Sequence, residues 1–522
     1  MINYIKNFWH QGWSDIREFI ISPILRQSYY KRCFLLIVLG VILYIPLMNS
    51  YNANHDEQAA MLLFRYSWKE MFHLIAVEDG HPPLYHIVYR LFQLGGDYHN
   101  IFALRVATLV IFVLMALLGA FPLRRLVGEQ ASLWFIFCVF FLPSSLWLGT
   151  NMRMYPLTVY VLAGAFIYSV LLYRDNRKAD WICFALFTIA GLYTHYFCAL
   201  VLMLIWVTLF LRLLAIKQFR KALILCGVGC VIALLYLPWL YVFLQQYNNM
   251  KATWFPKTIH RDAALYGFLF LLRGTTNPLI DGLFLFLGCW CWILAIEYIT
   301  EKKSGESVKI VKYGLFICWG LYLLTFVISC FFRPTLSARF LVVVMGIFYV
   351  TVAVSVNYYE KFKRVFLFFC SLAFLTGYLQ YYMFVNDTNI KRFVSEFRMK
   401  IPEKSLVLYA DTWTHLFMEF YLPEYHKLYV PLEPYIVLFQ DKILKEQQID
   451  PYEYSRIYYF RPRYISISAR KYYAEELSEL KSDLMLFNGY SGECLYLDRL
   501  EFGAAKRIIE KSRNILNSSM HK

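Results

Sequence analysis

The sequence is poor in charged residues. Only 17% of its 522 residues are Asp, Glu, Lys or Arg, whereas 59% are hydrophobic and 19% are aromatic. A water-soluble domain has about 25% charged and about 45–50% apolar residues. The composition therefore excludes an intrinsically disordered chain, which has too little apolar surface to bury, and indicates a membrane protein.

The cysteine spacing of a disulfide-stapled or zinc-binding protein is also absent. Of the 12 cysteines, only Cys494 lies away from the apolar runs, and no Cys-x-x-Cys sequence occurs. Cysteine within apolar sequence is typically a small buried hydrophobe. We therefore expect neither a disulfide framework nor a zinc–thiolate site.

Acidic residues are scarce before Asn386. The first 385 residues carry 32 Lys and Arg against 17 Asp and Glu, whereas the remainder carries 20 against 19. The excess cations lie in loops between apolar runs, where they set membrane topology. This placement indicates membrane lipids as partners and argues against nucleic acid.

Apolar runs of about 20 residues, long enough to cross a bilayer, occur about eleven times. They begin near Cys33, Ile101, Ala131, Pro156, Trp181, Phe197, Ala222, Gly282, Tyr313, Phe340 and Val365. Alternate loops hold most of the cations, which predicts a cytoplasmic amino terminus and, after an odd number of spans, an extracytoplasmic C-terminal part. This topology suits a bacterial inner (plasma) membrane, and an endoplasmic reticulum membrane stays open.

The predicted fold is a polytopic α-helical membrane protein with a C-terminal extracytoplasmic α/β domain. We expect a cytoplasmic segment at 1–32, a transmembrane domain at 33–385 with outer loops at 49–100 and 245–281, and a soluble domain at 386–522. The tail after Gly503 has no predicted fold. Predicted strands are Ser405–Ala410, Lys427–Leu432, Arg456–Phe460, Tyr464–Ser468 and Glu493–Leu497, with a helix at Tyr472–Leu484.

The first outer loop contains apolar residues at helical spacing, namely Phe64, Trp68, Met71, Phe72 and Ile75. This stripe predicts a helix that either lies in the membrane interface or packs on the transmembrane domain. In the interfacial arrangement, Arg65 and Lys69 face water.

The same loop carries two groups of polar residues that no span requires. Asp56 and Glu57 follow the first span, and Glu78, Asp79, His81 and Tyr85 come later. Carboxylates next to a membrane are costly unless they are solvated or functional. The alternative for Asp56 is a helix cap at a helix that begins at Glu57.

Arginines on the predicted outer side run against the positive-inside trend. Arg153 and Tyr155 precede the fourth span, and Arg339 precedes a late span. A guanidinium is suited to a pair of phosphate oxygens, although an arginine at this depth also extends to lipid headgroups. His195, at the outer end of the fifth span, is either a ligand or a hydrogen-bonded structural residue.

In this order, the motifs resemble those of polytopic glycosyltransferases of the GT-C superfamily, of the family 39 type that includes protein O-mannosyltransferases and lipid A aminoarabinose transferases. The similarity rests on His55-Asp56-Glu57, on the His-Pro-Pro-Leu-Tyr run His81–Tyr85, and on the segments Arg153–Tyr155 and Arg339–Leu341. It is good over residues 30–210, patchy to 385 and weak beyond.

The resemblance implies transfer of a sugar from a polyprenyl-phosphate donor to a lipid, glycan or protein acceptor, with inversion. Inversion needs one base opposite the leaving group; Asp56 is the candidate, with Glu57 as its neighbour or orienting group. Arg153 and Arg339, with Tyr155 nearby, are candidates to bind the donor phosphate, and Lys251, Arg261 and Arg273 are reserves. Substrate-binding candidates are Glu78, Asp79, His81, Tyr85 and His195.

No cofactor is required by the sequence, and a divalent metal held by the acidic–histidine group stays open. The competing class is a transporter or lipid flippase of envelope glycolipids. Such proteins place ionisable residues inside their spans. Here no Asp, Glu, Lys or Arg lies in the middle of a predicted span, which favours an enzyme.

Overall fold

The structure, a computed structural model, describes residues 28–520 except 49–50, 78, 94–99, 250–277, 333–334, 410–411, 431–449, 463–481 and 489–492. Several predictions lie outside the described residues. They concern most of the segment 1–32, Glu78, the reserve cations Lys251, Arg261 and Arg273, the strand Tyr464–Ser468 and most of the helix Tyr472–Leu484.

The chain forms two compact units. The first, here called the helical unit, comprises Met1–Pro46, Thr108–Leu235 and Pro256–Tyr378. The second, here called the mixed unit, comprises Leu47–Ala107, Tyr236–Phe255 and Leu379–Lys522. The first long loop thus clusters with the region after Asn386, a grouping that the sequence did not indicate.

Nine helices in the described part of the chain are long and apolar enough to cross a membrane. One of these spans, Ile101–Phe141, is 41 residues long and contains Gly128 with φ 81° and ψ 179°. That conformation is almost confined to glycine, so the chain turns at Gly128, inside the segment labelled α8 (Arg124–Phe141). The turn separates a span that contains α7 (Ile101–Leu118) and the π-helical segment Gly119–Leu123 from a second span that begins at Glu129. Together with the 15-residue α11 (Lys178–Leu192), the helices account for the eleven predicted runs. The chain is a polytopic membrane protein.

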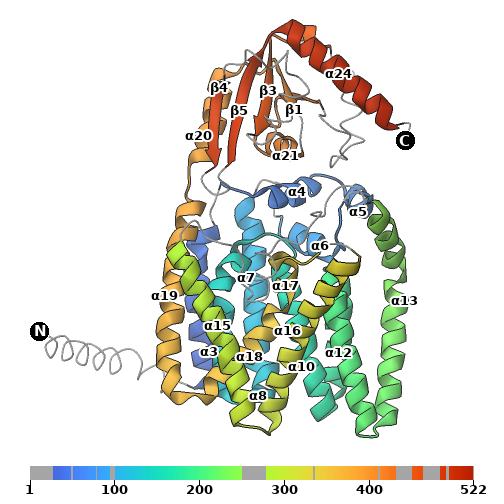
Figure 1. Ribbon diagram of the computed structural model, residues 1–522, viewed down its shortest axis with the longest axis vertical. Helices are drawn as coiled ribbons and strands as arrows, with labels where there is room; N and C mark the ends of the chain where they lie inside the picture. The colour runs from blue at the N-terminus through green and yellow to red at the C-terminus, as the bar shows by residue number, and fades with distance from the viewer. Residues whose placement is uncertain are drawn as a thin grey trace, which may run out of the picture. The chain divides into compact units, whose positions relative to one another are not determined.

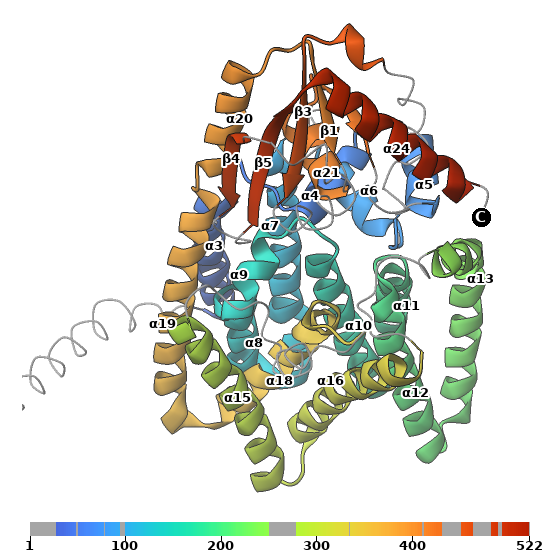
Figure 2. The same cartoon turned by 45° about the horizontal axis from the view of Figure 1, so that its top comes forward.

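Most of the other helices of the apolar part are labelled in Figure 1, and α9 is labelled in Figure 2. They are α3 (Tyr29–Met48), α9 (Pro143–Thr150), α10 (Tyr155–Asp175), α12 (Tyr196–Ala215), α13 (Phe219–Asn249), α15 (Pro278–Glu301), α16 (Glu306–Phe331), α17 (Ala338–Leu341), the 3₁₀ turn Val342–Val344, α18 (Met345–Tyr358) and α19 (Glu360–Val385).

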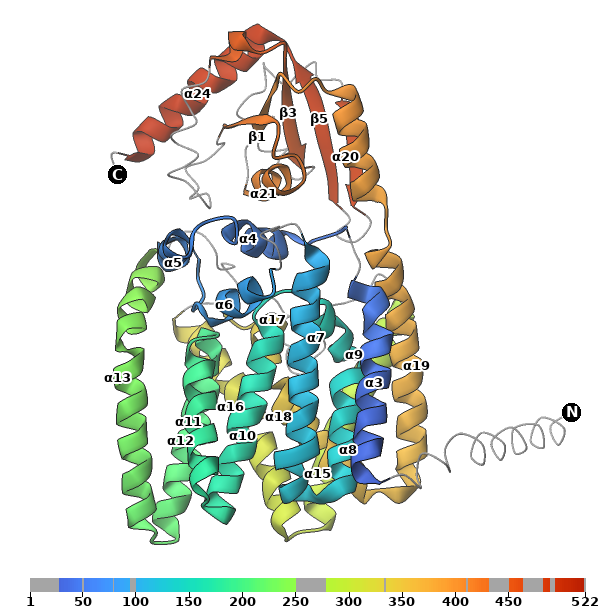
Figure 3. The same cartoon turned by 180° about the vertical axis from the view of Figure 1, so that it is seen from behind.

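Two helices, α10 and α18, form the centre of the helical unit. In the apolar stretches that contain α10 and α18, 83% and 89% of the residues are buried, whereas in that of α13 only 17% are buried. The two helices approach closely at Gly346, where an added Cβ would lie 2.6 Å from the carbonyl oxygen of Val159 and 2.7 Å from the Cβ of Ala163. Small residues allow such close packing in membranes, and Figure 3 shows both helices among their neighbours.

The first long loop of the mixed unit folds into α4 (His55–Leu63), α5 (Trp68–Val77) and α6 (Leu84–Leu91). Met71 and Ile75 of α5 are fully buried, while Trp68 and Phe72 are 43% and 37% exposed. Phe64 follows the end of α4. The prediction of one continuous helical stripe from Phe64 to Ile75 is therefore wrong, because the chain breaks between two helices.

In the described residues of the C-terminal part, five strands form a mixed sheet in the order β2-β1-β3-β5-β4. Strand β1 is parallel to β2 and β3, whereas β5 is antiparallel to β3 and β4. Ser482–Leu484 belongs to a strand, so this end of the predicted helix Tyr472–Leu484 is wrong. The strands are β1 (Ser405–Tyr409), β2 (His426–Tyr429), β3 (Arg456–Pro462), β4 (Ser482–Asn488) and β5 (Glu493–Leu500).

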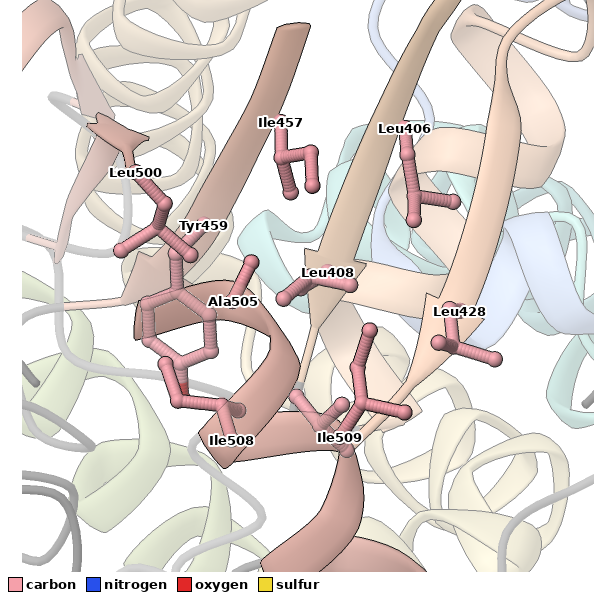
Figure 4. Packing of buried hydrophobic residues seen from close by; sticks show 10 residues of the cluster. Leu406, Leu408, Leu428, Ile457, Tyr459, Leu500, Ala505, Ile508 and Ile509 are labelled. Carbon is pink, nitrogen blue, oxygen red and sulfur yellow. The ribbon is translucent and has the colours of Figure 1, made fainter. Parts of the chain in front are cut away.

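Helices cover both faces of this sheet. The basic tail without a predicted fold forms α24 (Phe502–Met520), and its Ala505, Ile508 and Ile509 pack on one face of β1, β2, β3 and β5 (Figure 4). On the other face, Phe460 of β3 contacts the aromatic rings of α20 (Asn389–Lys400) and of α21 (Thr412–Tyr421). Because both faces are covered, the five residues of β1 are all buried.

Candidate functional site

Asp56 lies in the first turn of α4. Asn54 is the N-cap, since its side-chain oxygen accepts a hydrogen bond from the Glu57 amide at 3.0 Å and its own amide donates to Glu57 Oε2 at 2.9 Å. This reciprocal arrangement is a capping box. Asp56 is partly exposed, whereas Glu57 is 2% exposed. The alternative reading of Asp56 as the cap of a helix beginning at Glu57 is wrong, because the helix begins at His55.

Arg105, one turn into α7, is buried beside Glu57. Its Nη2 lies 3.9 Å from Glu57 Oε2 and donates to the carbonyl oxygen of Asn52 at 2.9 Å, while Nη1 donates to that of Leu47 at 3.4 Å. Both side chains of the ion pair are 3% exposed. A buried charge needs such partners. Through them Arg105 links the first turn of α4, at Glu57, with the backbone of Leu47 and Asn52 that precedes it.

The carboxylate of Asp79 contacts three side chains of the same loop, those of His81, Tyr85 and His86. His81 Nδ1 lies 2.7 Å from Oδ1, and His86 Nε2 lies 2.9 Å from Oδ2, to which the Tyr85 hydroxyl also donates at 3.3 Å. Burial would raise the pKa of Asp79, but the charges of His81 and His86 and their hydrogen bonds hold this pKa well below its usual value. The carboxylate is therefore ionised, and it orients both imidazoles.

Arg65 does not face water, contrary to the prediction for the interfacial helix. Its Nη1 donates to Glu419 Oε2 of α21 at 2.7 Å, and Lys427 Nζ lies 3.0 Å from the other oxygen of Glu419. Burial would raise the pKa of Glu419, but the charges of Lys427 and His415 and the hydrogen bond from Arg65 lower this pKa to about 2. The loop and the C-terminal region are thus joined by a buried charge cluster. Lys69 is exposed, as predicted.

We expect Glu419→Gln to reduce stability in a pH-dependent way. Because the folded-state pKa is depressed to about 2, the stabilising contribution is complete above the usual glutamate pKa and is lost as the pH falls toward 2. The shift corresponds to about 3 kcal/mol at neutral pH. Thermal unfolding at several pH values should show a difference between wild type and variant at pH 7 that shrinks below pH 4.5. The exposed Glu403→Gln serves as control, and a pH-independent difference would contradict the assignment.

In the helical unit, four predicted residues belong to one group of aromatic rings or lie close in sequence to a member of it. Tyr155, the first residue of α10, lies 6.1 Å from the His195 ring by ring centroids, and His195 lies 6.0 Å from Phe340. Arg153 is 8% exposed and lies two residues before Tyr155; Arg339 is partly exposed and is adjacent to Phe340. The segment before α10, the N-terminus of α12 and α17 therefore converge.

His195 has a structural task in this group. Its Nδ1 accepts a hydrogen bond from the Phe197 amide at 3.1 Å, and the residue is the N-cap of α12 with 2% exposure. This agrees with the alternative of a hydrogen-bonded structural histidine. Within the described part of the chain, no group of three or more His, Cys, Asp and Glu is placed to hold a metal ion.

Several residues of the site were not singled out from sequence. Arg105 lies near one end of an apolar run, where an arginine is expected at the boundary of any span, so its position alone does not mark it as a site residue. His86 directly follows the run His81–Tyr85, but it is not part of that motif, so the motif did not mark it as a site residue. Glu419 and Tyr421 lie more than 350 positions from the loop residues that they contact, so no local pattern could have revealed them.

The fold of the chain is shared with solved structures of another protein. Two solved structures of ArnT from Cupriavidus metallidurans superpose on the chain. The apo structure does so with a TM-score of 0.58 and 10% identity, and the structure bound to undecaprenyl phosphate with 0.56 and 11%. Each alignment covers 90% of this chain and 98% of the other.

Other comparisons add less. The Archaeoglobus fulgidus oligosaccharyltransferase, solved with zinc and sulfate, superposes with a TM-score of 0.42 and 12% identity, over 85% of this chain and 69% of its own. No family model matches the sequence, and no curated protein matches it. At these identities the likeness is one of fold.

Proposed function

We propose that the chain is an inverting glycosyltransferase that moves a sugar from a polyprenyl-phosphate donor to a lipid, glycan or protein acceptor. The observation that carries this proposal is that a chain with the GT-C fold has two adjacent carboxylates in different environments. Asp56 is partly exposed, whereas Glu57 is buried, accepts a hydrogen bond from the Asn54 amide and lies next to Arg105. ArnT, whose fold the chain shares, has been solved with undecaprenyl phosphate, and this supports the donor class.

In the proposed mechanism, Asp56 accepts the proton of the acceptor hydroxyl as its oxygen attacks the anomeric carbon. The bond to the donor phosphate breaks on the opposite face, which inverts the configuration. Glu57 serves as the orienting neighbour, since its carboxylate is bonded to the Asn54 amide and lies next to Arg105. Asp79 orients His81, which is partly exposed and suited to a sugar or acceptor hydroxyl.

Arg153 and Arg339 are the proposed partners of the leaving phosphate. Two guanidinium groups can stabilise the charge that develops on a lipid monophosphate, and no step of this scheme requires a metal. The proposed location is the extracytoplasmic side of a bacterial inner membrane, with the amino terminus in the cytoplasm. The positive charge of alternate loops supports this orientation.

The test is turnover of a panel of radiolabelled polyprenyl-phosphate sugars by the purified protein. Consumption of one donor, with release of the polyprenyl phosphate and inverted configuration in the product, is expected. Failure to consume any donor in the presence of lipid, glycan and peptide acceptors would reject the proposal.

For Arg153→Ala we expect weaker use of the donor. Loss of a charge-assisted hydrogen bond to phosphate should raise the donor KM roughly 10- to 100-fold, and inhibition by added undecaprenyl phosphate should weaken by a similar factor. Steady-state kinetics would measure both. The exposed Arg177→Ala is the matched control. A donor KM equal to that of the control would remove Arg153 from the site.

A further inference from the structure

Residues 51–54, which lead into α4, are held by a series of hydrogen bonds. Arg105 bonds to the Asn52 carbonyl, Gln58 Nε2 donates to the Ala53 carbonyl at 2.8 Å, and Glu57 accepts from the Asn54 amide. Glu57 and Gln58 belong to α4, and Arg105 belongs to α7. They place the start of α4, and with it Asp56.

Residues 51–53 also form hydrogen bonds with residues of the C-terminal region. The Tyr421 hydroxyl accepts a hydrogen bond from the Ala53 amide at 3.0 Å and donates to the carbonyl oxygen of Tyr51 at 3.1 Å. The Tyr51 and Tyr421 rings lie 5.2 Å apart by their centroids. Asn52 adds a third link, since its Nδ2 donates to the Asp387 carbonyl at 2.9 Å.

Helix α21, which carries Tyr421, also packs directly on α4 within the mixed unit (Figure 2). The last turn of α21 therefore contacts the loop on both sides of α4. Glu419 binds Arg65 just after α4 ends, and Tyr421 binds the backbone just before α4 begins. Tyr421 is 4% exposed and Glu419 is 7% exposed, so these contacts are interior ones.

We infer that Tyr421 is a positioning residue for the reaction, and that its hydroxyl fixes the Tyr51–Ala53 backbone so that Asp56 is presented to the acceptor. This inference rests on the proposed function. It assigns a role to the C-terminal region, because Tyr421 of this region bonds to the backbone that precedes the proposed base Asp56. Tyr421 itself touches neither the donor nor the acceptor in this scheme.

The test compares Tyr421→Phe with Tyr425→Phe. Both variants lose one buried hydroxyl of the same unit, but the Tyr425 hydroxyl donates to the Ile401 carbonyl at 3.0 Å, away from the loop. A base displaced by a fraction of an ångström to an ångström costs up to roughly 100-fold in rate. We expect Tyr421→Phe to lower kcat roughly 10- to 100-fold with donor KM unchanged, and Tyr425→Phe to leave kcat within about twofold of wild type.

Amide hydrogen exchange of residues 51–63 gives a readout that does not depend on turnover. Faster exchange there in Tyr421→Phe, and not in Tyr425→Phe, is expected. Unchanged kcat, an effect confined to KM, or unchanged exchange would overturn the inference. If wild type consumes no donor, the proposed function fails, while the exchange data still decide whether Tyr421 holds this segment.

Discussion

Asp56→Asn is expected to abolish glycosyl transfer while leaving the fold and donor binding intact. Removing a general base lowers a rate by roughly 100- to 10,000-fold, and an amide cannot accept the proton of the acceptor hydroxyl. Asn has nearly the same volume as Asp, and Asp56 is partly exposed, so stability should change little. The measurement is kcat with saturating donor and acceptor, beside the binding constant for undecaprenyl phosphate.

The matched control for Asp56→Asn is Glu70→Gln. Glu70 is an exposed carboxylate in the first turn of α5, in the same loop, where it accepts the Ser67 amide at 3.0 Å. Its substitution should leave kcat unchanged. Near-normal turnover by Asp56→Asn would remove Asp56 from the role of base, and equal losses in both variants would indicate a general disturbance of the loop.

Arg105→Met is expected to cause the largest loss of stability. Methionine removes the cation next to the buried Glu57 and the hydrogen bonds that Arg105 donates to the carbonyl oxygens of Asn52 and Leu47. Breaking a buried ion pair costs roughly 3–5 kcal/mol. The unfolding midpoint of the detergent-solubilised protein should fall accordingly, and turnover should fall with it because the start of α4 is released.

A double variant separates the charge effect from the loss of hydrogen bonds. Arg105→Met with Glu57→Gln removes both charges, so part of the lost stability should return. Arg177→Met, at an exposed position, controls for the substitution itself. An unfolding midpoint of Arg105→Met equal to that of the control would show that the pair with Glu57 contributes little.

The transmembrane part could be read from the sequence because each span is a local property. A run of about 20 apolar residues specifies a helix that crosses the bilayer whatever its neighbours are. The turn at Gly128 was equally local. Which helices lie at the centre was not predictable, since the contact of Gly346 with Val159 and Ala163 joins residues far apart in the chain.

Predictions in the C-terminal region were less complete because strand pairing is non-local. The runs around Val407 and Ile457 are apolar and β-branched enough to indicate strands. Ser482–Leu484 instead had a helical pattern, yet it pairs with Leu497 and Asp498 of β5. Cross-strand contacts overrode the local preference.

At the candidate site, residue types were predictable and partners were not. Adjacent acidic residues after the first span marked Asp56 and Glu57, and the local feature that separates them is the spacing of Asn54 and Glu57, which fits a capping box. The capping box with Asn54 and the buried Arg105 make Glu57 an interior group. Arg65 was expected in water because its partner, Glu419, lies 354 residues away.

Sealed proteoliposomes carrying a labelled polyprenyl-phosphate sugar test the central claim most directly. Sugar transfer to acceptor and movement of the lipid between leaflets would be followed together, for wild type and Asp56→Asn. The account predicts transfer by wild type alone, with the leaflet distribution of the donor the same for both. Movement of the lipid across the bilayer without sugar transfer would contradict it and would make the protein a flippase.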